Sequence, residues 1–252
     1  MYQTDTYEGI LAETVSLRGT NGDTINTYFA RPLGPGPFAG IVLAHHMPGW
    51  DEWYKETTLH FARQGYAAIC PNLYFRAGHG TPDDVAAKVR AVGGVPDDQA
   101  VGDLGAAGEF LRSLPNGNGK AAIFGTCSGG RHAYLTACRL PIFAAVIDCW
   151  GGRVVMQPDD LTPTQPVAPL DYTSQLNAPL LGLFGEQDTS PTPEQVARHE
   201  QELKKTGKTY EFHMYPDAGH GFFYQHRPMY RQAQAVDGWA KVFTFLEKHI
   251  KA

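Results

Sequence analysis

Short apolar runs alternate along the chain with longer segments that have the 3.6-residue periodicity of amphipathic helices. Most of these runs are apolar throughout, which is typical of strands that helices cover on both faces of a sheet. Runs of strand length occupy residues 39–44, 66–70, 121–124, 143–149, 179–184 and 210–215, and helical patterns occupy residues 52–63, 97–114, 128–139, 194–205 and 236–249. The alternation predicts an α/β protein with one doubly wound, mostly parallel sheet and no internal boundary, so that residues 1–252 form a single domain.

Residues 10–30 have the pattern of a β-hairpin. Two strand-like segments, 10–17 and 24–30, flank a polar linker with the dipeptide Asn21-Gly22, which is typical of tight turns. We therefore expect an N-terminal antiparallel hairpin ahead of the parallel strands.

Two long segments show no regular pattern. Residues 71–96 are rich in glycine, proline and polar residues, with one short helical stretch near 83–92, and we expect them to form a wall beside the functional site. Residues 153–177 contain four prolines, and irregular segments of that length inside a domain are often lids. This second segment is the candidate lid loop.

Composition and charge narrow the range of partners. The 252 residues carry 21 basic and 26 acidic side chains, and the net charge of −5 is spread without runs, which argues against a nucleic-acid partner. No apolar stretch approaches the roughly 20 residues that span a bilayer, and the acidic first residues lack the apolar core of a signal peptide. We expect no membrane partner, a cytoplasmic location, and a small neutral or weakly charged substrate.

The four cysteines, Cys70, Cys127, Cys138 and Cys149, lack C-x-x-C spacing. Three of them have mostly apolar surroundings and are predicted to be reduced thiols of the core. Cys127 differs, because it follows an apolar strand and precedes a helical pattern in the stretch K-A-A-I-F-G-T-C-S-G-G-R-H, residues 120–132.

This stretch has the pattern of a nucleophile elbow, G-x-Nuc-x-G, with cysteine in the position of the nucleophile. Such a nucleophile sits on a strained turn between strand and helix, where a Cβ atom two residues to either side would collide with one of them. Gly125 and Gly129 meet that requirement around Cys127. A thiol on this turn would also lie near a helix N-terminus, whose partial positive charge favours the thiolate.

Ser128 competes with Cys127 for the role of nucleophile, because its neighbours are small as well. The predicted strand ends at Gly125, and the elbow pattern places the nucleophile two residues after that glycine, which favours Cys127. The backbone N–H of Ser128 would then form one half of an oxyanion hole, and the N–H of Met47, in the loop after residues 39–44, would form the other.

A nucleophile of this kind needs an orienting acid and a base, which follow it along the chain in that order. Asp188 follows the strand predicted at 179–184 and His220 follows the strand at 210–215, so both lie where open sheets place their ligands. Either residue alone would be an ordinary loop residue, but together with the elbow they predict a triad. Asp217 is a competing acid, although its context P-D-A-G suits a turn better.

His45 and His46 stand in the loop after residues 39–44. Adjacent side chains diverge and no third ligand stands at a useful spacing, so a metal site is the less favoured interpretation, and one histidine is expected to face the thiol. Aromatic residues concentrate on the loops of the same edge, where some should line an apolar pocket. The pocket candidates are Trp50, Trp150, Phe222 and Tyr224, and neither a cofactor nor a metal is predicted.

On these residues the chain resembles the dienelactone hydrolase (carboxymethylenebutenolidase) family of α/β-hydrolases. The likeness runs from about residue 10 to residue 248 and includes the motifs G-Y-A-A-I-C-P-N-L-Y, V-G-D-L, G-T-C-S-G-G, G-E-Q-D and A-G-H-G-F. The resemblance implies a triad of Cys127, Asp188 and His220 and an oxyanion hole from the N–H groups of Met47 and Ser128. It also implies hydrolysis of a small ester or lactone through an acyl-cysteine, without a cofactor.

The chain departs from the family at positions that matter for activation and for the choice of substrate. Well-studied members have a glutamate where His46 stands, and that carboxylate takes part in activating the thiol. Here the thiol would be activated either by His220 alone or by pairing of Cys127 with His46. Members that cleave dienelactone bind its carboxylate with two arginines. Tyr224 stands at the place of one, and Lys88 or Arg90 could replace the other. The candidate lid loop is also longer than that of the family.

The leading hypothesis is a hydrolase of small esters or lactones in which His220 deprotonates Cys127 and water releases the acyl group from the enzyme. Two alternatives stay open. A serine-type carboxylesterase would use Ser128 in place of the thiol, and a non-catalytic small-molecule binder or redox sensor would keep the scaffold without the turnover.

Overall fold

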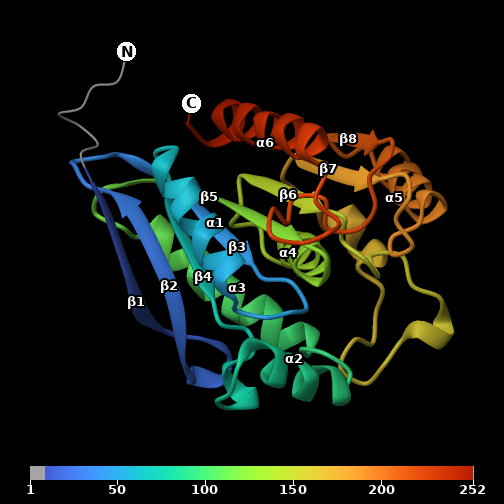
Figure 1. Cartoon of the computed structure of the whole chain (residues 1–252), viewed down its shortest axis with the longest axis horizontal. Helices are drawn as coiled ribbons and strands as arrows, with labels where there is room; N and C mark the ends of the chain where they lie inside the picture. The colour runs from blue at the N-terminus through green and yellow to red at the C-terminus, as the bar shows by residue number, and fades with distance from the viewer. Residues whose placement is uncertain (1–8, 252) are drawn as a thin grey trace.

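The computed structural model describes residues 9–251, and its strands form one sheet in the order β1-β2-β4-β3-β5-β6-β7-β8 (Figure 1). The six strands from β4 to β8 in this order pair in parallel, whereas β1 and β2 run antiparallel at one edge. The strands are β1 Ile10–Arg18, β2 Thr24–Pro32, β3 Phe38–Ala44, β4 Ala67–Pro71, β5 Gly117–Thr126, β6 Ala145–Cys149, β7 Leu180–Gly185 and β8 Tyr210–Tyr215. The predicted mostly parallel α/β sheet with an N-terminal hairpin is therefore confirmed.

The hairpin turns at the predicted dipeptide. Asn21 and Gly22 both have a left-handed backbone, with φ of 59° and 78°. These two residue types adopt that conformation at little cost, which is why the turn forms there. Since β2 pairs with β4, the hairpin extends the sheet beyond its parallel part.

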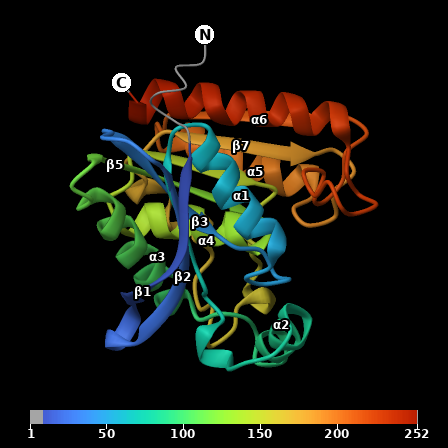
Figure 2. The ribbon, with the colours of Figure 1, turned by 60° about the vertical axis from the view of Figure 1, so that its left-hand side comes forward.

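Helices cover both faces of the sheet, as the apolar strands predict (Figure 2). α1 and α6 pack on one face, and α3 and α4 pack on the other. The helices are α1 Glu52–Arg63, α2 Pro82–Ala91, α3 Asp97–Arg112, α4 Ser128–Arg139, α5 Pro193–Lys205 and α6 Gln232–Leu246. α6 begins four residues before the predicted Val236, because its first turn contains only glutamine and alanine, whose short or polar side chains add little to the apolar periodicity.

The strand side chains alternate between two apolar clusters. Ile41 and Leu43 of β3 belong to the cluster under α1 and α6, whereas Val42 and Ala44 belong to the cluster under α3 and α4. All four are fully buried. Each such strand contributes apolar area to both clusters, and burial of that area is the main stabilising term for the central sheet.

The candidate lid loop at 153–177 is irregular, as predicted, apart from short 3-10 helices at Pro158–Asp160 and Pro169–Gln175. The Thr164 carbonyl accepts a hydrogen bond from the Asp97 N–H at 2.9 Å, and the Thr164 hydroxyl donates to Gly93 at 3.3 Å. The loop is thus attached to the start of α3. Among residues 9–251, no helix has the length and apolar character needed to cross a membrane.

Candidate active site

The parallel register brings the predicted site loops to one edge of the sheet. Ala44 at the end of β3 pairs with Gly125 of β5, and Thr126 at the end of β5 pairs with Cys149 at the end of β6. The loops that follow β3, β5, β6, β7 and β8 therefore leave the sheet on the same side, where ligands of open α/β sheets bind.

Cys127 lies on a sharp turn between β5 and α4. Its φ of 56° and ψ of −128° are unusual for a residue with a side chain. A Cβ atom on Gly125 would overlap the carbonyl oxygen of Gly129, and a Cβ atom on Gly129 would overlap that of Ala44. The requirement for small neighbours thus comes from the close approach of the helix start to the ends of two strands.

Asp188 and His220 meet across the loops after β7 and β8. The Nδ1 atom of His220 lies 2.9 Å from Oδ2 of Asp188, whose other oxygen accepts the Ser190 N–H at 2.8 Å. Asp188 is only 5% exposed, so its carboxylate depends on these partners. The competing acid Asp217 instead lies exposed in a turn with φ of 58°.

Electrostatic interactions link His220 to Cys127. Burial raises the pKa of the Cys127 thiol, but the hydrogen bond and charge of His220 outweigh burial and bring this pKa below its ordinary value. Burial lowers the pKa of His220, but its bonds to Asp188 and to the sulfur raise that pKa to about 10. Both shifts favour the charged pair, a thiolate next to an imidazolium, over the neutral pair.

Two backbone N–H groups approach the same sulfur. Those of Ser128 and Met47 both donate hydrogen bonds to it, which also lowers the pKa of the Cys127 thiol. The Tyr74 hydroxyl donates to the Met47 carbonyl at 3.0 Å and so holds the loop after β3 in place. Two N–H donors that converge beside the sulfur can also stabilise a negative oxygen that forms on a carbon bonded to that sulfur.

His46 and His45 both have partners other than the thiol. Nε2 of His46 lies 2.8 Å from Oδ2 of Asp51, and His46 is not among the groups that shift the thiol pKa. His45 is held between the His46 carbonyl and the Leu73 N–H, and burial lowers the pKa of His45 to about 4. Over residues 9–251, no three metal-ligating side chains come close enough to form a site.

Two clefts open beside Cys127 and His220. The lid-side cleft, of about 600 Å³, is bordered by Met47, Ser128 and, from the segment after β6, Gly152, Arg153, Thr162 and Gln165. The His46-side cleft, of about 530 Å³, is bordered by the loop after β3 and by residues 224–229. Cys127 and His220 lie between the clefts, so a substrate can extend to either side of the sulfur.

Of the two cations considered for a substrate carboxylate, only Arg90 reaches the site. Arg90 borders both clefts, and its guanidinium has no ion-pair partner among the described residues. Lys88 borders neither cleft, and its ammonium donates to the His79 carbonyl.

His46 and the four aromatic pocket candidates separate into two groups. His46 and Tyr224 border the His46-side cleft. Trp150 and Phe222 are fully buried and pack together behind His220, and Trp50 donates its indole N–H to the Cys70 carbonyl. These last three support the loops and do not line either cleft.

Sequence reasoning missed a buried network behind the elbow. The Thr126 hydroxyl lies 2.9 Å from the hydroxyl of Tyr54 and 2.7 Å from that of Tyr224. The network therefore joins α1, the end of β5 and the loop after β8 directly next to Cys127. No local signal could have revealed it, because the three residues are far apart along the chain and the sequence indicates only a pocket role for Tyr224.

The remaining cysteines are buried and free, as predicted. Burial raises the pKa of the Cys138 thiol to about 12 and those of Cys70 and Cys149 well above their ordinary value. Cys127 is the one cysteine of the four whose pKa is lowered, which is the direction that favours the thiolate form.

The sheet order, the elbow and the loops at its carboxyl edge define an α/β-hydrolase. The family model described as the dienelactone hydrolase family matches residues 25–250, and the chain therefore belongs to that family.

Individual relatives agree with this family. A Salmonella typhimurium protein named "Putative carboxymethylenebutenolidase" is 34% identical over 97% of this chain and 90% of its own length. A Methylorubrum extorquens protein of the same name is 36% identical over 93% of this chain and 80% of its own length. The crystal structure titled "Putative Dienelactone Hydrolase" from Klebsiella pneumoniae has a TM-score of 0.86 and 30% identity, and covers 96% of this chain and 100% of that one.

Proposed function

We propose that the protein hydrolyses a small ester or lactone with Cys127 as the nucleophile, His220 as the base and Asp188 as the orienting acid. The observation that carries the proposal is the position of the thiol on the elbow, in contact with a histidine that a buried aspartate holds. The names of the relatives, carboxymethylenebutenolidase and dienelactone hydrolase, support a lactone as the substrate class.

The reaction begins with the thiolate–imidazolium pair. The sulfur attacks the carbonyl carbon, and the resulting oxyanion accepts the N–H groups of Ser128 and Met47. The C–O bond to the alcohol then breaks as His220 gives its proton to the leaving oxygen. The product of this half is an acyl-cysteine next to a neutral imidazole.

Water completes the cycle. His220 takes a proton from a water molecule, whose oxygen attacks the thioester carbonyl carbon. Collapse of the second tetrahedral intermediate breaks the C–S bond, releases the carboxylic acid and restores the thiolate beside the imidazolium. Since Asp188 bonds Nδ1, the other ring nitrogen is left to carry the transferred proton.

Two further roles belong to the same proposal. Arg90 is the candidate partner for a carboxylate on the substrate, because it borders both clefts and is not neutralised by a neighbouring acid. Residues 153–177 are proposed to act as a lid within a single domain, since Arg153, Thr162 and Gln165 of this segment border the lid-side cleft.

Trapping of the acyl group tests the nucleophile. Incubation with a small aryl ester, an acid quench and peptide mapping should find the acyl group on Cys127, and Cys127→Ala should give no labelled peptide. An acyl group on Ser128 would instead support a serine-type carboxylesterase. Reversible oxidation of Cys127 without turnover of any ester would support a redox sensor.

A further inference from the structure

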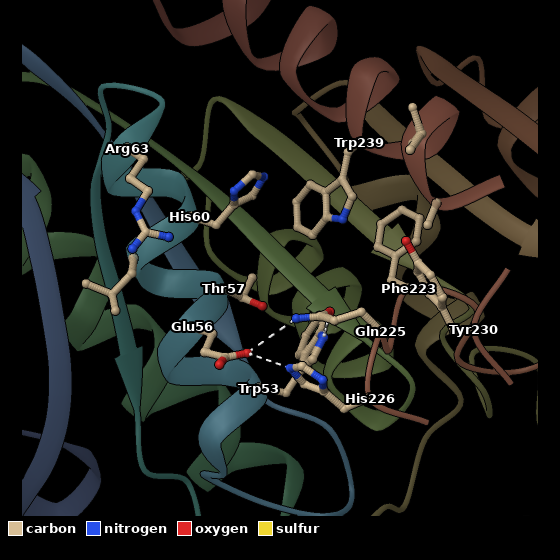
Figure 3. Close-up of a pocket in the computed structure, with 13 residues that line it drawn as sticks. Trp53, Glu56, Thr57, His60, Arg63, Phe223, Gln225, His226, Tyr230 and Trp239 are labelled. Atoms are coloured by element: carbon tan, nitrogen blue, oxygen red, sulfur yellow. Dashed lines mark hydrogen bonds and ion pairs between the residues drawn. The ribbon is translucent and has the colours of Figure 1, made fainter. Parts of the chain in front are cut away.

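A third cavity, of about 560 Å³, lies between α1, the loop after His220 and the start of α6 (Figure 3). We call it the aromatic cavity, because Trp53, Phe223 and Trp239 are among the residues that border it. It does not contain Cys127 or His220, and nothing in the proposed reaction uses it. A cavity of this size can hold an alkyl chain or an aromatic ring.

The aromatic cavity and the His46-side cleft share one wall. Trp53 and His226 border both spaces. Tyr224, which borders only the cleft, packs edge to face against Trp53 at 4.8 Å between ring centroids. Trp53 and Tyr224 are buried, so they form the inner part of the wall, and the loop residues Gln225 and His226 form its outer rim.

Three polar contacts hold the rim against α1, and Figure 3 shows them at one end of the cavity. The Trp53 indole N–H donates to the side-chain oxygen of Gln225 at 3.1 Å. The amide of Gln225 donates to Glu56 at 3.3 Å, and Nε2 of His226 lies 3.5 Å from the same carboxylate. The side chains of His226 and Glu56 are 69% and 41% exposed. The two contacts to Glu56 are long and exposed, and such contacts are weak, so one hydrogen bond of ordinary length, from Trp53 to Gln225, is the main bond that must break for the rim to open while the inner wall stays packed.

The cavity has a polar part, bordered by Glu56 and Arg63 among others, and an apolar part that can take an alkyl group. The apolar part continues from the aromatic rings to Ala235 and Val236 of α6. Val236 is 63% exposed, which leaves an apolar side chain without a protein partner at the cavity mouth. Transfer of alkyl groups from water into such a space is favourable by an amount that grows with each methylene.

We propose that the aromatic cavity is an extension of the substrate site for the apolar end of a longer ester, and that the Gln225–His226 rim sets the length of substrate that the cleft accepts. The proposal rests on the ester or lactone hydrolase function proposed above. With the rim closed, the cleft takes short substrates. With the rim open, the cleft and the cavity form one continuous space that starts at the sulfur of Cys127.

Chain-length profiles test the rim. For p-nitrophenyl esters from acetate to octanoate, the ratio of kcat/KM for octanoate to that for acetate should rise at least about tenfold in Gln225→Ala/His226→Ala, because several methylenes gain apolar contact. Addition of Val236→Trp, which fills the cavity from an exposed position, should return the ratio to the wild-type value. Gln64→Ala, an exposed glutamine just after α1 that borders neither space, is the matched control and should leave the ratio unchanged.

A second measurement does not depend on turnover. The rate at which N-octylmaleimide modifies Cys127, relative to N-ethylmaleimide, should rise in the double variant and fall again after Val236→Trp. An unchanged ratio in the double variant, or a gain that survives Val236→Trp, would overturn the proposal. Failure of the proposed hydrolase function would give a different result. The wild type would then hydrolyse no short ester in a Cys127-dependent way, but the ratio of the two maleimide rates would still show whether the rim opens.

Discussion

Nδ1 of His220 lies 2.9 Å from the buried carboxylate of Asp188, and this one contact determines how the histidine meets the sulfur of Cys127. The two loops that carry these residues follow neighbouring parallel strands, β7 and β8. Because Asp188 holds the ring and favours its protonated form, the pKa of His220 is raised to about 10 and that of the thiol is lowered.

Replacement of Asp188 should uncouple this pair. Asp188→Asn keeps the size of the side chain but removes its charge, so we expect kcat/KM to fall by about 10²- to 10⁴-fold. The midpoint for iodoacetamide alkylation of Cys127 should move to higher pH, because the imidazolium that stabilises the thiolate is itself destabilised. Asp217→Asn is the control and should change neither quantity. An unchanged alkylation midpoint in Asp188→Asn would contradict the assignment of the acid.

The two candidate nucleophiles can be separated by single substitutions. Cys127→Ala should reduce ester hydrolysis by about 10³-fold or more, since the residual rate comes from the oxyanion hole and binding alone. Ser128→Ala should stay within about threefold of the wild type, because its contribution is a backbone N–H that alanine retains. Steady-state kinetics on a p-nitrophenyl ester checks both, and the opposite pattern would select Ser128.

The pH profile of kcat/KM should be bell-shaped. The rate rises as pH passes the lowered pKa of Cys127, because the thiolate is the nucleophile, and it falls as pH passes about 10, where the imidazolium loses the proton that the leaving alcohol needs. Between the two limits the profile should be flat. A rising limb centred near 9, the ordinary thiol value, would show that His220 does not act on the sulfur.

Asp51 is predicted to contribute to both stability and activity. Its carboxylate accepts the Tyr54 N–H as the N-cap of α1 and also bonds His46. Asp51→Ala should lower the free energy of unfolding by about 2 kcal/mol, from the lost cap and an unpaired buried histidine nitrogen. Activity should fall as well, since the same loop carries the Met47 N–H. Thr192→Ala removes the N-cap of α5 with a side chain that borders neither cleft, and in urea titrations it should cost about 1 kcal/mol with a smaller loss of activity than Asp51→Ala.

Asp148 should make stability depend on pH. It is fully buried in β6, and burial raises its pKa from 3.8 to about 7, although the bond from the Gly151 N–H opposes that rise. The unfolded chain loses this proton near pH 4 but the folded protein keeps it until about pH 7, so stability falls as pH rises through that window. Asp148→Asn should remove this fall. The melting temperature of Asp148→Asn minus that of the wild type should therefore become larger as pH rises from 4 to 7. The exposed Asp159→Asn should show no such trend.

The order of elements and the elbow were accessible from the sequence because each depends on local chemistry. Apolar runs such as 39–44 mark strands buried on both faces, and Asp51 marks the start of α1 through its capping side chain. Gly125 and Gly129 mark the turn at Cys127, since no larger residue fits beside those carbonyl groups. The family could be inferred from the same motifs.

The roles of His46 and of the aromatic residues depended on packing between distant segments. The bond of His46 to Asp51, in place of a contact with the thiol, follows from the course of the loop after β3. Nothing in the sequence distinguishes Trp50 and Trp150 from cleft residues. Trp50 is turned away from the clefts by its bond to the Cys70 carbonyl, and Trp150 by its packing against Phe222 and Phe223.

The sequence by itself determined the strand-helix order, the small residues around Cys127, and the order of nucleophile, acid and base, because spacing and residue type encode these directly. Only the tertiary structure decided that Arg90 and not Lys88 borders the clefts, that Tyr54, Thr126 and Tyr224 form one network, and that Trp53 separates two cavities. The physical reason is that these relationships join residues from separate loops and helices. Their distances are set by how the elements pack, which no local pattern records.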